Sequence, residues 1–180
     1  MASLNDVELG ALLALAEIDD LGPATVRALV DSRGSARGAL RALVDDTVGP
    51  RELNLKQRGS VRDVLRGRRP DRHAAETAAR AARRLKPDDR LVGYGLPGYP
   101  ERLRRLHFPP LVLWARGPLA VDAPRSVSIV GTRRATAPAR RLARDMASGL
   151  AAAGVRVVSG LASGIDGQAH RGALEAGGET

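Results

Sequence analysis

The chain has 180 residues and carries 29 lysines and arginines against 20 aspartates and glutamates, a net charge of +9. It contains no cysteine, which excludes disulfides, thiolate metal sites and a cysteine nucleophile. No apolar run approaches the roughly 18 residues of a membrane span, and no basic segment precedes an apolar one at the start. We therefore expect a cytoplasmic protein with neither a membrane anchor nor a secretory signal.

The positive charge comes almost entirely from arginine and is unevenly distributed. Residues 1–48 hold 4 basic and 8 acidic residues, residues 49–90 hold 13 and 6, and residues 91–180 hold 12 and 6. A guanidinium group matches the oxygens of phosphate bidentately, so an arginine-rich chain indicates a phosphate-bearing partner. The alternative, that these arginines only form solvated helix faces, stays open at this point.

Residues 1–70 are predicted to form a small helical domain. Apolar residues recur at helical spacing over residues 4–16, and Leu21-Gly-Pro-Ala-Thr25 separates them from a second helix that begins at about Val26. Ser35 is expected to cap a third helix. Residues 49–69 have no clear assignment.

A helical linker is predicted over residues 71–90. Asp71 is expected to cap an alanine-rich helix that runs to about Leu85, and Pro87 ends it.

The pattern changes to α/β from residue 91 to residue 180. Strands are expected at 91–94, 111–115, 126–130 and 155–158 and helices at 138–153 and 165–176, so that strands and helices alternate from residue 126 onward. Short continuous apolar strands followed by helices are typical of a parallel sheet that is covered on its faces. Two strand–helix units do not complete such a sheet, so we expect the chain to be a fragment of a longer protein, truncated at its C-terminus.

Two loops at predicted strand ends carry the features of an anion site. They are Gly131-Thr-Arg-Arg-Ala-Thr136 and Ser159-Gly-Leu-Ala-Ser-Gly-Ile-Asp166, and each leads into a helix N-terminus that favours an anion. Further arginines, including Arg140, follow in the first turns of the next helix. The alternative is that the glycines only make tight turns and the hydroxyl groups only cap helices.

No catalytic constellation is evident. The histidines at 73, 107 and 170 lack metal-ligand spacing, and no serine is placed as an activated nucleophile. Asp166 and His170 lie four residues apart on one helix and therefore face each other. We favour a helix-end pair without chemistry over the alternative that Asp166 holds His170 in one orientation. We expect no catalytic residue, no metal and no cofactor.

Three stretches closely resemble the DNA-processing protein A family, also called DprA or Smf. They are Ser128-Ile-Val-Gly-Thr-Arg-Arg-Ala-Thr136, Val157-Val-Ser-Gly-Leu-Ala-Ser-Gly-Ile-Asp166 and Ala169-His-Arg-Gly-Ala-Leu-Glu-Ala-Gly-Gly178. The resemblance implies a SAM/helix-hairpin-helix-like helical domain followed by the first part of an extended Rossmann-like sheet. It also implies a homodimeric, non-enzymatic protein that binds single-stranded DNA and loads the recombinase RecA during natural transformation.

The resemblance, together with the loop chemistry, predicts a nucleic-acid-binding set in the two loops. Its members are Gly131, Thr132, Arg133, Arg134, Thr136, Arg140, Ser159, Gly160, Ala162, Ser163, Gly164 and Asp166. Three positions depart from the family pattern: Thr132 replaces serine, Ala139 replaces glycine, and Ser163 stands where many members carry a basic residue.

Two further readings bear on function. The turn at residues 21–23 resembles a helix-hairpin-helix motif, but the acidic residues directly before it favour a fold element over a DNA contact. The alternative function is a nucleotide-binding enzyme of the phosphoribohydrolase (lysine-decarboxylase-like) type, which would need a later Pro-Gly-Gly-x-Gly-Thr loop. Aromatic residues that stack on bases are scarce, and the only candidates are Tyr94, Tyr99, Phe108 and Trp114.

Overall fold

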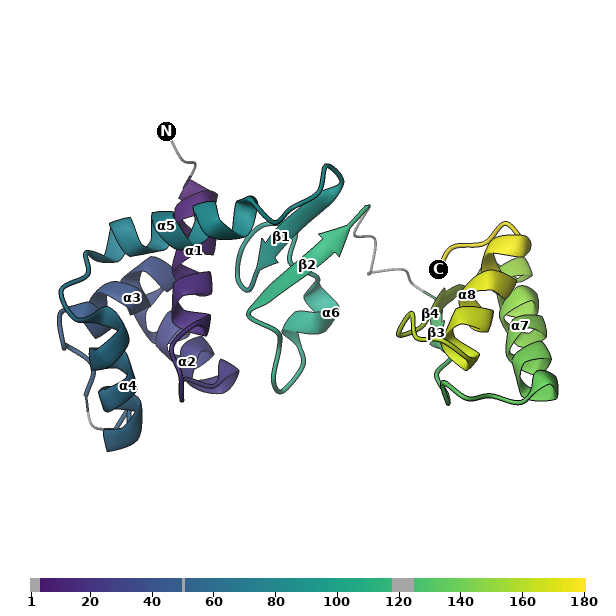
Figure 1. Cartoon of the computed structure of the whole chain (residues 1–180), viewed down its shortest axis with the longest axis horizontal. Coiled ribbons are helices and arrows are strands. Elements are labelled where there is room, and N and C mark those ends of the chain that lie inside the picture. The colour runs from purple at the N-terminus through teal and green to yellow at the C-terminus, as the bar shows by residue number, and fades with distance from the viewer. Residues whose placement is uncertain (1–3, 50, 118–124) are drawn as a thin grey trace. The chain divides into compact units, whose positions relative to one another are not determined.

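A computed structural model describes residues 4–49, 51–117 and 125–180 (Figure 1). The internal contacts divide the chain into two units, unit 1 from Met1 to Val121 and unit 2 from Asp122 to Thr180. The described residues contain eight helices and two two-stranded sheets, which confirms the mixed α/β class. The predicted boundaries at residues 70 and 90 differ from this division and stay a prediction.

Unit 1 begins with five helices. They are α1 (Leu4–Ala16), α2 (Pro23–Arg33), α3 (Ala36–Val44), α4 (Leu55–Leu65) and α5 (Pro70–Ala82). The predicted cap of α3 is confirmed, because the Ser35 hydroxyl accepts the Gly38 N–H at 2.9 Å. Helix α4, which the sequence left unassigned, starts with a capping box in which Asn54 and Gln57 satisfy each other's backbone N–H groups.

The predicted role of Asp71 is wrong. Arg69 occupies the N-cap position of α5 and Pro70 begins the helix, so Asp71 lies inside the first turn. Its carboxylate instead pairs with the guanidinium groups of Arg37, at 2.6 Å, and Arg41, at 2.8 Å. The helix also ends at Ala82 rather than at 85, because the backbone continues as tighter hydrogen-bonded turns.

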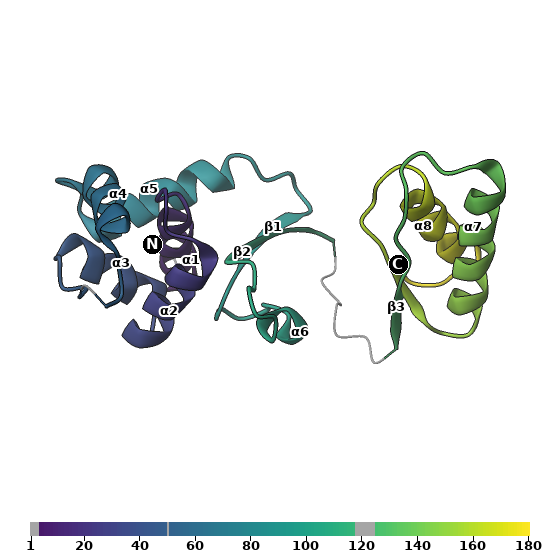
Figure 2. The same cartoon turned by 90° about the horizontal axis from the view of Figure 1, so that it is seen from below.

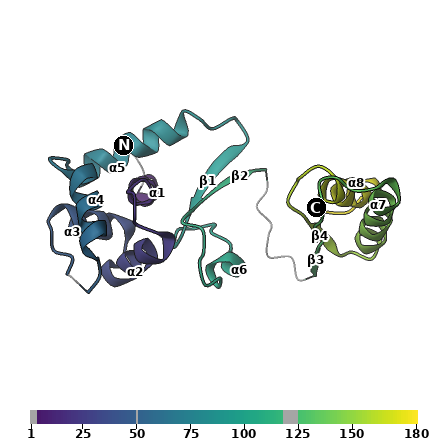
Figure 3. The same cartoon turned by 60° about the horizontal axis from the view of Figure 1, so that its bottom comes forward.

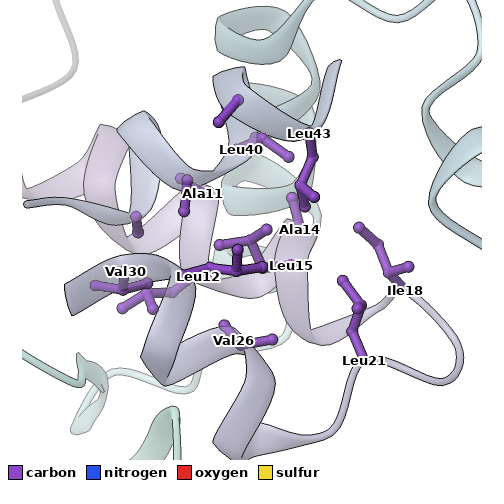
Figure 4. Packing of buried hydrophobic residues seen from close by; sticks show 14 of the residues in the cluster. Ala11, Leu12, Ala14, Leu15, Ile18, Leu21, Val26, Val30, Leu40 and Leu43 are labelled. Atoms are coloured by element: carbon purple, nitrogen blue, oxygen red, sulfur yellow. The ribbon is translucent and has the colours of Figure 1, made fainter. Parts of the chain in front are cut away.

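The core of unit 1 is built from large aliphatic side chains. Leu12 and Leu15 on α1 are fully buried and pack with residues of α2 and α3 (Figure 4). Figure 3 looks nearly along α1, with α2, α3 and α5 around it. Helices α1 and α5 approach closely at Gly10, where a Cβ atom would lie 2.4 Å from the Ala74 carbonyl oxygen.

An antiparallel strand pair completes unit 1. Strand β1 (Asp89–Gly93) pairs with β2 (Val112–Arg116), from Asp89 opposite Arg116 to Gly93 opposite Val112, and the short helix α6 (Glu101–Arg104) lies between them. A Cβ atom on Gly93 would lie 2.7 Å from the Leu12 side chain, so the strand packs directly on α1. These strands therefore belong with the helices before them.

Unit 2 has the order strand, helix, strand, helix. Its elements are β3 (Ser126–Ser128), α7 (Ala137–Ala152), β4 (Arg156–Val158) and α8 (Ile165–Glu175). The predicted parallel pairing is confirmed, with Val127 opposite Val157. The last residues lie along the other edge of β4, since Val157 donates its N–H to the Glu179 carbonyl at 3.1 Å and its carbonyl accepts the Thr180 hydroxyl at 2.7 Å.

Small residues allow α7 and α8 to pack closely in unit 2 (Figure 2). A Cβ atom on Gly172 would lie only 2.1 Å from the Arg144 carbonyl oxygen. The buried cluster consists of alanines and one valine: Ala147, Ala151, Val157, Ala169 and Ala173. Within the described ranges, no helix of either unit combines the length and apolar character that crossing a bilayer requires.

Candidate nucleic-acid interface

The carboxylate of Asp166 connects the two predicted loops of unit 2. Its Oδ1 accepts the Gly131 N–H at 3.0 Å, and its Oδ2 accepts the Gly160 N–H at 3.0 Å. Asp166 lies in the first turn of α8 and is 5% exposed. One buried carboxylate therefore holds the ends of β3 and β4 at a set spacing.

The surroundings of Asp166 favour its charged form. The Gly131 N–H lowers the pKa of this carboxyl below its usual value, burial acts in the opposite direction, and the Gly160 N–H lowers it further. The position at a helix N-terminus also suits a negative charge. Asp166 is consequently an ionised internal acceptor at neutral pH.

The hydrogen bonds to Asp166 give two of the loop glycines a structural role. Gly131 and Gly160 belong to the predicted nucleic-acid-binding set, and the backbone N–H group of each donates to Asp166. Both sites also exclude a side chain, because an added Cβ atom would lie 2.7 Å from Ile165 at Gly131 and 2.8 Å from the Asp166 carboxylate at Gly160. Only the contact between distant residues, which sequence spacing does not encode, could have revealed this role.

The two loops also interlock through their backbones. Gly164 has φ +90°, and a Cβ atom there would lie 2.2 Å from the Thr132 carbonyl oxygen. That same oxygen accepts the Ile165 N–H at 3.3 Å. Glycine at 164 is thus required both by its backbone conformation and by the close approach of the first loop.

The hydroxyl groups of the loops stabilise the local backbone. Ser159 donates to the Ile129 carbonyl at 2.6 Å, and the Thr132 hydroxyl accepts the Arg134 N–H at 3.2 Å. The Thr136 hydroxyl caps α7 by accepting the Ala139 N–H at 3.4 Å. Ser163 is exposed on the second loop, beside the half-buried Ala162.

Four exposed arginines surround the first loop and the start of α7. They are Arg133, Arg134, Arg140 and Arg141, and no carboxylate of the described residues lies within ion-pair distance of them. Arg141 was not in the predicted set. Arg144, one turn further along, pairs with Glu175 on α8 at 2.5 Å. The arginines nearest the loop therefore keep an uncompensated positive charge.

The predicted residues fall into a frame around the buried carboxylate of Asp166 and an exposed cationic surface. Asp166 with its glycines forms the frame, and the arginines form the surface. His170 makes its side-chain hydrogen bond with Thr180, whose hydroxyl lies 2.6 Å from Nδ1, and not with Asp166. The described residues contain no group of three or more His, Asp or Glu side chains that could hold a metal ion. The geometry suits the binding of an anion at the surface.

Comparison with protein families matches residues 90–180 to the model described as DNA recombination-mediator protein A. A putative DNA processing protein DprA of Mycobacterium tuberculosis is 42% identical over 148 residues, which cover 74% of this chain and 38% of that protein. The DNA processing protein DprA of Bacillus subtilis is 39% identical over 83 residues, 46% of this chain and 28% of that protein.

A third relative, the protein Smf of Borreliella burgdorferi, is 30% identical over 105 residues, which cover 58% of this chain and 33% of that protein. The chain thus spans less than two fifths of the length of each of these relatives.

Proposed function

Because the chain belongs to the DNA recombination-mediator protein A family, we propose that it binds single-stranded DNA during DNA processing and recombination. The binding site lies on the two loops of unit 2 and on the first turns of α7. Contacts go to the phosphate backbone, so the binding is independent of base sequence.

The main support for this proposal is that Asp166 orders the two loops while the arginines beside them remain unpaired among the described residues. The buried carboxylate satisfies the inner N–H groups of both loops and orders their backbones. The arginines at 133, 134, 140 and 141 then project from an ordered support without a protein counter-charge. Uncompensated guanidinium groups favour phosphate, because their planar fork matches its oxygens bidentately.

The aromatic content of unit 2 indicates how the DNA is held. Residues 122–180 contain no phenylalanine, tryptophan or tyrosine, so this unit offers none of these rings for base stacking. In unit 1, Tyr94 is buried and the Tyr99 hydroxyl donates to the Pro110 carbonyl, which leaves Phe108 and Trp114 as the exposed rings. Binding at the unit 2 loops is therefore electrostatic and depends steeply on salt.

The fold of unit 2 is part of the same proposal. We take the parallel pair β3–β4 with α7 and α8 as the beginning of a Rossmann-like sheet. The bonds from Glu179 and Thr180 to Val157 support this reading, since they place the chain along the free edge of β4. We likewise take the helices of unit 1 as a SAM/helix-hairpin-helix-like domain.

The loop assignment is tested by replacing one arginine and measuring DNA affinity. We expect Arg133→Ala to weaken binding to a labelled oligo-dT by about fivefold at 50 mM salt and to reduce the salt slope by about 0.7, the loss of one phosphate contact on a single strand. Arg171→Ala, an exposed arginine on α8, is the matched control and should change neither value. Unchanged affinity and slope for Arg133→Ala would contradict the assignment.

The partners of the full-length protein extend this proposal. We expect a homodimer that loads the RecA recombinase onto single strands in natural transformation and that is a binding protein rather than an enzyme. RecA filament assembly on coated single strands, with and without the full-length protein, measures this activity. The family match does not favour the alternative of a phosphoribohydrolase-type nucleotide enzyme.

A further inference from the structure

A second group of arginines lies in unit 1, on the turn between α4 and α5. Arg62 lies on α4, Arg66, Arg68 and Arg69 lie in the turn, and Arg72 lies in the first turn of α5. We call these five residues the α4–α5 arginine surface. All five are exposed. They account for much of the positive charge between residues 49 and 90, which the loops of unit 2 leave unexplained.

Three adjoining pockets make this surface concave. The middle pocket, of about 280 Å³, is lined by Arg68, Arg69 and Arg72 together with Gly67, His73 and Glu76. It shares Arg68 with a pocket that also contains Arg62 and Arg66. It shares Arg69 and Arg72 with a third pocket on its other side. The arginines therefore follow a continuous track rather than a single point.

Arg68 is held in place without losing its charge. Its Nε donates to the Val64 carbonyl at 2.7 Å, and its Nη1 lies 3.1 Å from Nδ1 of His73. A guanidinium group can only donate, so Nδ1 accepts and the imidazole proton resides on Nε2. Burial, together with the Arg68 charge, lowers the pKa of His73 and keeps it neutral. Both anchors of Arg68 are thus uncharged.

Four carboxylates line the three pockets, Asp45, Asp46, Asp71 and Glu76, yet of these only Glu76 forms an ion pair with an arginine of the track. Asp71 is already engaged by Arg37 and Arg41. Glu76 pairs with Arg72 at 2.8 Å in an exposed ion pair. Within the described residues, no carboxylate lies within ion-pair distance of the other arginines of the track, Arg62, Arg66 and Arg69.

The start of α5 adds to the attraction for an anion. Arg69 provides no side-chain cap, and Pro70 has no N–H, so the first turn presents uncapped N–H groups beside the middle pocket. The positive end of the helix dipole lies at the same place. This 13-residue helix supports the arginines in binding an anion.

We propose that the α4–α5 arginine surface is a second contact for the phosphate backbone of nucleic acid, separate from the loops of unit 2. This inference rests on the proposed function for the class of ligand. A polyanion fits better than a single ion, because the track passes through three pockets. An acidic protein segment is the competing ligand, because apolar side chains such as Leu53 and Leu65 line the pocket that contains Arg62 and Arg66, and the test below distinguishes the two.

The test removes two arginines that the middle and third pockets share. In the 180-residue chain, Arg69→Gln combined with Arg72→Gln should weaken oligo-dT binding about fivefold to tenfold at 50 mM salt. The salt slope should fall by about 1.4, the loss of two phosphate contacts. The control, Arg83→Gln with Arg84→Gln, removes the same charge from exposed positions after α5 and should change affinity less than twofold.

A second variant is expected to strengthen DNA binding rather than weaken it. Glu76→Gln removes the carboxylate of the middle pocket and should tighten oligo-dT binding about twofold, a gain that misfolding cannot produce. Equal losses in the two double variants would show that only overall charge matters, and would overturn the proposal. Unchanged DNA binding combined with lost binding of labelled poly-glutamate would overturn it in favour of an acidic protein partner.

Arg133→Ala, measured in parallel, separates this proposal from the assignment of the unit 2 loops. If Arg133→Ala binds normally and the Arg69/Arg72 variant binds weakly, the loop assignment fails and this inference stands. If only Arg133→Ala binds weakly, this inference fails and the loop assignment stands.

Discussion

The two units achieve internal packing by different means. Unit 1 buries large leucines such as Leu12 and Leu15 between helices, so its stability comes mainly from apolar area. Unit 2 buries alanines between α7 and α8 and orders its loops through a single carboxylate, Asp166. A unit with few large buried side chains depends more strongly on close backbone spacing and on individual polar contacts. The two units should therefore respond to different substitutions.

The arginines also differ between regions. Several in unit 1 are neutralised by carboxylates, as in the pairs Arg33–Glu52 and Arg80–Glu17. Those around the first loop of unit 2 have no carboxylate partner among the described residues, and of the α4–α5 arginine surface only Arg72 has one. The net charge of +9 thus does not show where an anion would bind, because some arginines are paired with carboxylates while others, including most of these two groups, are not.

The largest effect is expected from the leucine core. Leu12→Ala should destabilise unit 1 by about 3 kcal/mol, because it removes a fully buried side chain and leaves a cavity. The single tryptophan, Trp114, lies in unit 1, so urea unfolding followed by its fluorescence reports on that unit. Leu55→Ala, at a position that is 90% exposed, is the control and should change stability by less than about 0.5 kcal/mol. A similar loss in both variants would refute a leucine-based core.

A helix glycine in unit 2 should give the next largest effect. Gly172→Ala should destabilise the unit by about 2 kcal/mol, because the new methyl group would collide with the Arg144 carbonyl and force α7 and α8 apart. Gly149→Ala meets no atom within 4 Å and should stabilise α7 by about 0.7 kcal/mol. Far-UV circular dichroism records both. Effects of the same sign would mean that close helix spacing does not govern unit 2.

The smallest of the three effects concerns Asp166. Asp166→Asn should lower the Tm of unit 2 by about 5 °C, because the amide leaves one of the two loop N–H groups without an acceptor. Folding lowers the pKa of Asp166. Its carboxylate therefore contributes fully to the stability of unit 2 above the pKa of the unfolded chain, about 4, and this contribution is lost as the pH falls through the pKa of the folded state.

The matched control for this last prediction is Asp145→Asn, at an exposed position of α7. Thermal unfolding is followed by circular dichroism at pH 7 and at pH 3. The difference in Tm between the wild-type protein and Asp166→Asn should be smaller at pH 3 than at pH 7. Asp145→Asn should have the Tm of the wild-type protein at both pH values. A constant difference would show that the charge of Asp166 does not hold the loops.

Local sequence patterns predicted the elements that depend on neighbouring residues. The cap at Ser35 and the parallel pairing of β3 with β4 are confirmed, as is the mixed α/β class. The antiparallel pairing of β1 with β2 and the capping box of α4 were not predicted. The strand pairing was missed because an apolar run of five residues does not encode its partner or direction.

Local patterns were sufficient to predict most of the helices and strands, the family to which the motifs belong and the places where glycines and arginines gather. Which of those charges remain free depends on how the chain folds. Asp71 binds Arg37 across 34 positions of the chain, and Asp166 binds the Gly131 N–H across 35. A carboxylate's partner depends on distances created by folding, and for this reason the same residue types serve as internal ties in one place and as an anion-binding surface in another.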